Sequence, residues 1–255
     1  MSFHLSKWYL DCVNEAGEVF IGYVGHLEWG FLNLHYSSVL STEKSQIAQR
    51  NSLRERSLPL LDGSSICWNS AEFGVTGIWQ PCCRDVHETV FEDSSGSVQW
   101  NCLMPRARVQ IGNETSLGYA EHLTMTIAPW KIPIDRLQWG RFCSSSDSIV
   151  WIDWRGDYAK RIVYVNGAPA ASSAIDDRQI AFEDGSRLTM DHSLTLREGP
   201  LGSTALSSIP GVANTLPARL LQINECKWRS RARFDRPEQH SVEGWAIHEI
   251  VQWPK

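Results

Sequence analysis

The sequence lacks the features that mark membrane proteins and nucleic-acid-binding proteins. No run approaches the roughly 18 consecutive apolar residues of a membrane-spanning helix. Lys and Arg number 24 against 29 Asp and Glu, and the net charge of −5 argues against a nucleic acid as the main partner. The first residues hold no basic stretch followed by an apolar segment, as a secretory signal would. We therefore expect a globular, cytoplasmic protein without a transmembrane segment.

Motifs for common cofactors are also absent. The sequence has no Gly-x-x-x-x-Gly-Lys-Ser/Thr phosphate loop, no Gly-x-Gly-x-x-Gly, no His-Glu-x-x-His and no Gly-x-Ser-x-Gly. Its seven cysteines are scattered without a Cys-x-x-Cys pair, which favours reduced thiols over a disulfide framework or a zinc site. We expect neither a metal nor an organic cofactor.

The abundant signal is that of β-strands and tryptophan. Period-2 stretches of β-branched and aromatic residues, bounded by turn residues, recur along the whole chain, as in a sandwich or barrel. Thr42 to Leu58 has good helix formers but a poor apolar stripe, so we predict a loop there with one short helix at most. The prediction is an all-β fold of two pseudo-duplicated halves, 1–128 and 129–255, packed as one compact unit. Twelve Trp exceed the six Tyr and eight Phe.

Two segments near the midpoint carry a family resemblance. The first is Leu117-Gly118-Tyr119-Ala120-Glu121-His122, and the second is Leu137-Gln138-Trp139-Gly140-Arg141-Phe142. Together they resemble the hydroxyneurosporene synthase (carotenoid 1,2-hydratase) and AttH-like proteins, which carry a Gly/Ala-Tyr-x-Asp-His-Asn-Trp-Gly segment and then a Trp-x-Trp-Gly/Ser-Arg segment. Tocopherol cyclases are more distantly similar. The resemblance implies a pair of lipocalin-like antiparallel β-barrels.

The chain departs from the family pattern at three places. Glu121 stands where the family has Asp, Leu123-Thr124-Met125 stands where Asn-Trp-Gly is expected, and Leu137 replaces the first Trp of the second segment. Trp139 and Arg141 are retained. The resemblance covers about a quarter of the chain, and it implies a fold more directly than a substrate.

Glu121 is the first candidate catalytic residue. Strand alternation puts it on one face with Tyr119, Leu123 and Met125. A carboxyl among apolar side chains loses hydration, which favours the protonated form that a general acid needs. The alternative is that Glu121 pairs with an arginine, such as Arg141, and joins two strands.

His122 is a candidate because the resembling family has an acid-His pair at this point. In a regular strand it faces away from Glu121 and is the more solvated of the two; a β-bulge would reverse this. The alternative is an ordinary surface histidine.

The last strand offers a second carboxylate. Glu249 shares a face with Trp245, and two inward carboxyls in different surroundings can supply an acid and a base. Alternatively, Glu249 pairs with the basic row of the neighbouring strand. That row is either a solvated outer face or a clamp for an anion, and it consists of Lys227, Arg229, Arg231 and Arg233.

Asp153 is a third carboxylate, on the same strand face as Trp151, and it joins the pocket if that face lines the barrel. Trp100 belongs to another apolar stripe. The indole rings could line a cavity for a flat or polyene-like ligand and stabilise a carbocation, or they could simply form a core.

The leading hypothesis is a cofactor-independent enzyme that hydrates, cyclises or isomerises a lipophilic, terpenoid or polyene-like substrate at a C=C bond. Glu121 would donate the proton, Glu249 or Asp153 would activate water or stabilise positive charge, and Tyr119, Trp139 and Arg141 would orient the substrate. The alternative is a lipocalin-like carrier of a hydrophobic small molecule. A metal-dependent enzyme using His122 and Glu121 is a third possibility.

Overall fold

The computed structural model describes residues 2–203 and 218–254. In these ranges helix is confined to the three residues of η1 (Pro129–Lys131) and the four of α2 (Ala218–Leu221). The all-β prediction with very little helix is therefore confirmed. Contacts divide the chain into two compact units, Met1–Ala128 (unit 1) and Pro129–Lys255 (unit 2). No helix in the described ranges is long and apolar enough to cross a membrane.

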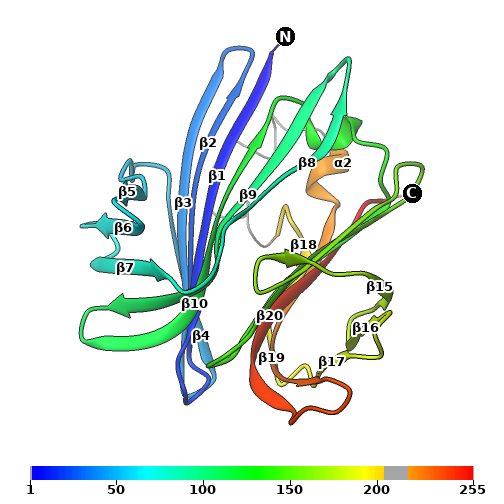
Figure 1. Cartoon of the computed structure of the whole chain (residues 1–255). Helices are drawn as coiled ribbons and strands as arrows, with labels where there is room; N and C mark the ends of the chain where they lie inside the picture. The colour runs from blue at the N-terminus through cyan, green and yellow to red at the C-terminus, as the bar shows by residue number, and fades with distance from the viewer. Residues whose placement is uncertain (1, 204–217, 255) are drawn as a thin grey trace. The chain divides into compact units, whose positions relative to one another are not determined.

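Unit 1 is one antiparallel sheet in which the first strand pairs with the last. The strand order is β4-β3-β2-β1-β10-β9-β7-β6-β5, and β8 pairs with β9 beside this path (Figure 1). The strands are β1 (Phe3–Val13), β2 (Val19–Trp29), β3 (Leu32–Glu43), β4 (Gln46–Ser52), β5 (Leu60–Asp62), β6 (Ser65–Ser70), β7 (Val75–Pro81), β8 (Val86–Asp93), β9 (Gly96–Ile111) and β10 (Glu114–Met125).

Unit 2 repeats this topology with every strand number raised by ten. Its order is β14-β13-β12-β11-β20-β19-β17-β16-β15, with β18 paired to β19 beside the path. The strands are β11 (Arg136–Cys143), β12 (Ser148–Arg155), β13 (Lys160–Val165), β14 (Ala168–Pro169), β15 (Ser172–Ile175), β16 (Gln179–Phe182), β17 (Arg187–Met190), β18 (Leu194–Pro200), β19 (Asn224–Asp235) and β20 (Val242–Gln252). Both sheets curl into half-barrels, which confirms the two-half, lipocalin-like β fold.

The duplication is visible in the closing strand of each unit. Gly118 in β10 and Gly244 in β20 lie against backbone carbonyl oxygens of the first strand, where an added Cβ would collide with them. Counting from these glycines, Gly118-x-Ala120-x-His122 matches Gly244-x-Ala246-x-His248. The position of Glu121 is held by Ile247 in unit 2.

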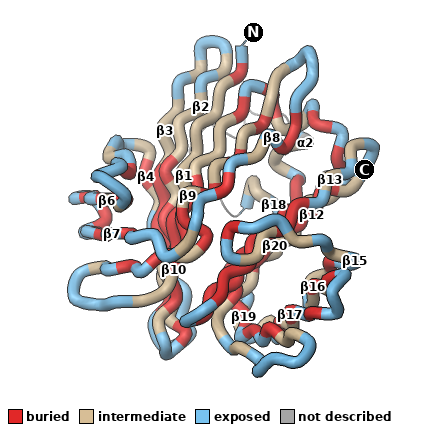
Figure 2. Tube along the Cα trace, in the orientation of Figure 1, coloured by how far each residue is buried: buried red, intermediate tan, exposed pale blue. Residues whose placement is uncertain are grey.

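Each sheet has a core face, which carries an apolar cluster, and a second face. In unit 1 the cluster includes Leu10 and Ala120 beneath the Trp68 ring. In unit 2 it includes Phe142 and Ala246. Burial is greatest in the half of β1 that ends at Val13 and decreases toward the opposite ends of β1, β2 and β3 (Figure 2). Residues of the second face alternate with core residues along each strand.

The prediction of a loop over Thr42 to Leu58 was wrong as far as Ser52, whereas residues 53–58 lie between β4 and β5 as a loop, as predicted. The segment contains no helix; instead β3 continues to Glu43 and β4 pairs with it along its whole length. Most residues of β4 are exposed, so its sequence shows neither the period-2 apolar pattern of a strand nor the 3.6-residue pattern of a helix. Pairing with β3 overrides the local helix propensity.

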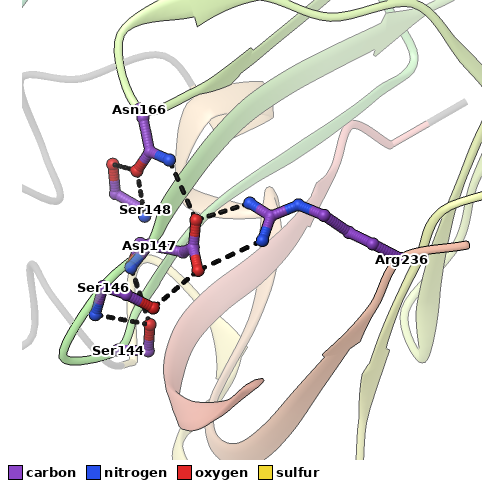
Figure 3. Close-up of polar contacts among 6 residues, drawn as sticks. All are labelled: Ser144, Ser146, Asp147, Ser148, Asn166 and Arg236. Carbon is purple, nitrogen blue, oxygen red and sulfur yellow. Dashed lines mark hydrogen bonds and ion pairs between the residues drawn. The ribbon is translucent and has the colours of Figure 1, made fainter. Parts of the chain in front are cut away.

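One carboxylate in unit 2 ties three turns together (Figure 3). Asp147, between β11 and β12, lies 2.5 Å from Nη2 of Arg236, which follows β19. It accepts hydrogen bonds from Asn166 Nδ2, between β13 and β14, at 2.9 Å and from the Ser146 hydroxyl at 2.7 Å. Burial alone would raise the pKa of Asp147, but the bonds from Arg236, Asn166 and Ser146 outweigh it and lower the pKa to about 2.

We expect Asp147→Asn to lower the free energy of unfolding by about 2 kcal/mol at pH 7. Because the folded-state pKa lies below the unfolded value, this stability is present above pH 4 and is lost as the pH falls toward 2. Urea unfolding of both proteins at pH 7 and pH 2 checks this. Asp157→Asn, an exposed aspartate of the same unit, is the control and should change stability little at either pH.

Candidate functional site

A buried carboxyl group lies on the second face of unit 1. Glu121 in β10 is 4% exposed. Its Oε2 accepts a hydrogen bond from Trp100 Nε1 at 2.5 Å and another from the Tyr119 hydroxyl at 2.6 Å. Burial, with the neighbouring Cys102 and Glu121, raises the pKa of Tyr119 well above its usual range, so the phenol remains a neutral donor. Two donors thus fix one oxygen of Glu121 in place.

Strand pairing explains why these side chains meet. β10 pairs regularly with β1, so Tyr119 and Glu121 project to the second face while Ala120 enters the core. Trp100 reaches that face from β9, because it pairs directly with Leu123. The β9 register shifts on both sides of Ala120, as at a bulge. Glu121 therefore lies on the predicted face, but its carboxyl meets two polar donors as well as apolar neighbours.

Apolar side chains extend from Glu121 over the same face. Five of them form one row of directly paired positions across β9, β10, β1, β2 and β3, and Leu123 of β10 lies between that row and Glu121. We call this set the apolar wall: Leu5, Leu27, Leu34, Val98, Leu123 and Met125. The four leucines are half-buried, and the other two side chains are buried. Glu121 thus adjoins a partly accessible apolar surface.

His122 lies on the core face, opposite to Glu121. Its Nε2 is 2.8 Å from Ser6 Oγ, and its ring stacks on Trp8 with the ring centres 4.5 Å apart. Burial and the neighbouring His4 lower the pKa of His122. Because adjacent residues of a strand face opposite ways, this geometry argues against one site built from both residues. Among the described residues, no group of three or more His, Cys, Asp or Glu could hold a metal ion.

In unit 2 three paired side chains cross β11, β20 and β19 on the second face. Trp139 pairs with Glu249, and Glu249 pairs with Lys227. Lys227 Nζ forms an ion pair with Glu249 Oε2 and lies 5.4 Å from the centre of the Trp139 ring. Nearby, the fully buried Arg141 donates to the carbonyl oxygen of Trp245 at 2.9 Å. Glu249 therefore has a cationic partner on the neighbouring strand, the alternative that the sequence left open.

The basic row of β19 changes character along the strand. Lys227 and Arg229 are only 2% and 9% exposed, whereas Arg231 and Arg233 are exposed. The Arg229 guanidinium lies 4.8 Å from the centre of the Trp245 ring. A solvated outer face therefore describes only half of the row. The protein's own cations already lie over these indole rings, which makes the rings less suited to stabilising a carbocation.

Glu225 belongs to the same charged cluster, although the sequence analysis did not select it. Its side chain is 5% exposed; Oε2 lies 3.3 Å from Arg197 Nη1 and Oε1 lies 3.8 Å from Lys227 Nζ. Burial raises the pKa of Glu225, Lys227 opposes that shift, and Glu249 adds to it. Alternation could have found this residue, since it precedes Lys227 by two positions.

Asp153 and Trp151 lie on the core face of unit 2, away from Glu249. Trp151 belongs to the apolar cluster, and Asp153 follows it by two positions. Both oxygens of Asp153 are engaged: Oδ2 lies 2.7 Å from Arg155 Nη2, and Oδ1 lies 3.2 Å from Arg161 Nε. Asp153 and Glu249 project from opposite faces of one sheet, so the condition under which Asp153 would join a pocket with Glu249 is not met.

A second buried histidine occupies the core face of unit 2. His248 is 2% exposed, its Nε2 lies 2.8 Å from Ser230 Oγ, and its ring centre lies 5.3 Å from that of Trp228. Burial, followed by the nearby His192 and Lys227, lowers the pKa of His248 to about 3. The imidazole is therefore neutral at physiological pH.

We expect His248 to make the protein sensitive to mild acid. Its folded-state pKa lies below the unfolded value of about 6.5, so the unfolded chain binds the proton first, and stability falls by about 1.4 kcal/mol per pH unit below pH 6.5. In His248→Gln, urea unfolding between pH 7 and pH 4.5 should show a flatter dependence on pH. The exposed His240→Gln is the control, and an equal slope in both variants would contradict the assignment.

Comparison with known proteins identifies structural neighbours. No sequence-family model and no curated protein matches the chain. Solved structures with a similar fold include CghA bound to Sch210972, with a TM-score of 0.59, 9% identity and coverage of 98% of this chain and 88% of that chain. Kievitone hydratase from Nectria haematococca has a TM-score of 0.55 and 14% identity, with coverage of 97% and 88%. An AttH-type protein from Nitrosomonas europaea has a TM-score of 0.53 and 10% identity, with coverage of 97% and 92%. These likenesses agree with the fold that the sequence resemblance implied.

Proposed function

We propose that this protein is a cofactor-independent enzyme that protonates a C=C bond of a lipophilic small molecule, as a hydratase, cyclase or isomerase does. The observation that carries the proposal is the Glu121 carboxyl. It is buried, fixed by Trp100 and Tyr119, and adjoins the apolar wall. A buried carboxyl in an apolar surface can deliver a proton to a substrate that carries no polar group at the reacting carbon.

The reaction balances without a cofactor. The Glu121 proton forms a C–H bond with the π electrons of the alkene, and the other alkene carbon becomes cationic. In a hydratase, water adds its oxygen to that carbon and then loses a proton to a base. In a cyclase or isomerase, the cation is neutralised by an internal nucleophile of the substrate or by loss of a neighbouring proton. The Trp100 and Tyr119 donors would stabilise the carboxylate that Glu121 becomes.

The other candidate residues are considered in turn. Glu249 belongs to unit 2 and is paired with Lys227, and we assign it no step in the reaction at Glu121. Trp139, Arg141 and Trp245 also belong to unit 2, and we do not place them at the Glu121 site. We assign no chemical step to Asp153, because guanidinium groups engage both of its oxygens.

The structural neighbours support this choice of reaction. One is named a hydratase, and its substrate by name, kievitone, is a reasonable first compound to test. Carotenoid hydration and tocopherol-type cyclisation, which the resembling families perform, are further candidates within the same chemistry. The proposed substrate is a terpenoid or polyene-like molecule.

Turnover in isotopically labelled water tests the proposal. The purified protein is incubated with kievitone in H₂¹⁸O, and a hydratase should yield a product that has gained one water carrying ¹⁸O. A polyene alcohol in D₂O is the second substrate, and an isomerase or cyclase should incorporate deuterium at carbon. Tight binding of these compounds without isotope incorporation would instead favour the lipocalin-like carrier.

A further inference from the structure

The part of unit 1 that holds the apolar wall is a sheet with two chemically different faces. On the core face, beyond the apolar cluster, Ser6 pairs with His26 and His26 pairs with His35. One residue away on each strand, the second face carries the apolar wall. At this end the core face therefore carries polar side chains, while the half-buried leucines of the second face carry no polar group.

The apolar surface has a measurable length. Tyr9 pairs with Glu121, and Phe3 lies six residues earlier in β1 on the same face. Phe3 pairs with Trp29, and Trp29 pairs with Leu32, so a further apolar row crosses three strands beyond the wall. At about 3.4 Å per residue, the surface extends roughly 20 Å from the carboxyl.

Charge on this surface is sparse and balanced. In the rows between Glu121 and Phe3, the charged side chains of the described strands are Lys7 of β1 and Glu88 of β8. Lys7 Nζ lies 5.9 Å from the centre of the Tyr23 ring. One cation and one anion favour a neutral ligand over a charged one.

We propose that the apolar wall binds the extended tail of a neutral, chain-like substrate, up to about 20 Å long, whose reactive end lies at Glu121. This proposal rests on the proposed function and adds to it the shape and charge of the substrate. It commits to a small lipophilic molecule because the surface is continuous with a buried carboxyl and carries no net charge. The tail would replace water on the half-buried leucines.

Binding of a chain-length series tests this proposal without any turnover. Octanol, decanol and dodecanol are titrated into the full chain by calorimetry. Each added methylene should tighten binding about twofold, half of the roughly fourfold effect of full burial, because a wall covers one side of the chain. Equal affinity for the three alcohols, or no binding of any, would overturn the proposal.

Two variants localise the effect. Leu5→Gln places an amide in the wall two rows from Glu121, on the strand that pairs with β10, and we expect it to weaken dodecanol about tenfold and octanol less than threefold. His26→Gln, at a neighbouring strand on the core face, is the matched control and should leave all three affinities unchanged. Equal weakening of the three alcohols by Leu5→Gln would contradict a tail site. If that variant does not fold, the series on the unchanged chain decides alone.

Failure of this inference can be told apart from failure of the proposed function. Glu121→Gln retains the wall, so it should bind the alcohols with the same dependence on length as the parent protein. A length-dependent series with no catalysis would keep the tail site and remove the enzyme. Catalysis with a flat series would keep the enzyme and remove the tail site.

Discussion

Glu121→Gln is expected to fold normally and to lose about 10²–10⁴ in turnover of any substrate found by the isotope experiment. Glutamine keeps the shape of the side chain, and its carbonyl oxygen can still accept the bonds from Trp100 and Tyr119. It cannot supply the proton. Steady-state kinetics and a thermal melt of the same preparation measure the two effects separately.

Tyr119→Phe is the matched variant for this experiment. It removes one of the two hydrogen bonds to Oε2 and leaves the carboxyl able to donate a proton. We expect a cost of about 1–2 kcal/mol in stability and a rate effect much smaller than that of Glu121→Gln. If Glu121→Gln is strongly destabilised yet retains full turnover per folded molecule, Glu121 has no part in the reaction and the carrier function gains support.

Lys227→Met should be among the most destabilising single changes in unit 2, at about 3–5 kcal/mol. Lys227 is 2% exposed and lies between two carboxylates, with Glu249 as its close ion pair and Glu225 at 3.8 Å. Methionine fills a similar volume but leaves those buried charges without the ammonium. Urea unfolding at pH 7 measures the loss.

The same strand provides the control. Arg231 lies four residues further along the same face and pairs with Glu243 at 2.8 Å, but both side chains are more than half exposed. Arg231→Met should therefore cost less than about 1 kcal/mol. Adding Glu249→Gln to Lys227→Met should recover part of the lost stability, because it removes the carboxylate that has lost its lysine partner. Similar losses of stability in Lys227→Met and Arg231→Met would show that burial does not determine how much each basic side chain of β19 contributes.

Local patterns were enough to predict the fold class and the faces of the candidate carboxylates. The period-2 alternation around Glu121 and Glu249 predicts the face on which each side chain lies, because it depends only on neighbours in the chain. The sequence analysis did not identify the short repeat Gly-x-Ala-x-His, which occurs at Gly118 and again at Gly244. Its meaning became clear only when the strand order showed that both segments close a sheet.

Features that depend on which strands become neighbours could not be read from the sequence. Trp100 and Glu121 meet because β9 pairs with β10 through an irregular register, and the sequence does not encode that register locally. Of the arginine partners of Asp153, Arg155 lies two residues further on the same strand and follows from alternation, whereas Arg161 depends on the pairing of β13 with β12. Asp153 and Glu249 face apart because their strands present them to opposite sides of the sheet. Alternation within one strand does not show which of its faces lies on the same side as a given face of another strand.

The pairing of first and last strands within each half has a consequence for synthesis. β1 cannot find β10, nor β11 find β20, until the whole half has left the ribosome, so the sheet-closing contacts are long-range in sequence. Unit 1 can complete its sheet once residue 128 has emerged, while unit 2 must wait until β20 has emerged. A nascent chain stalled after unit 1 has emerged should already be resistant to protease, whereas one stalled just before β20 should expose the unpaired edges of β11 and β19.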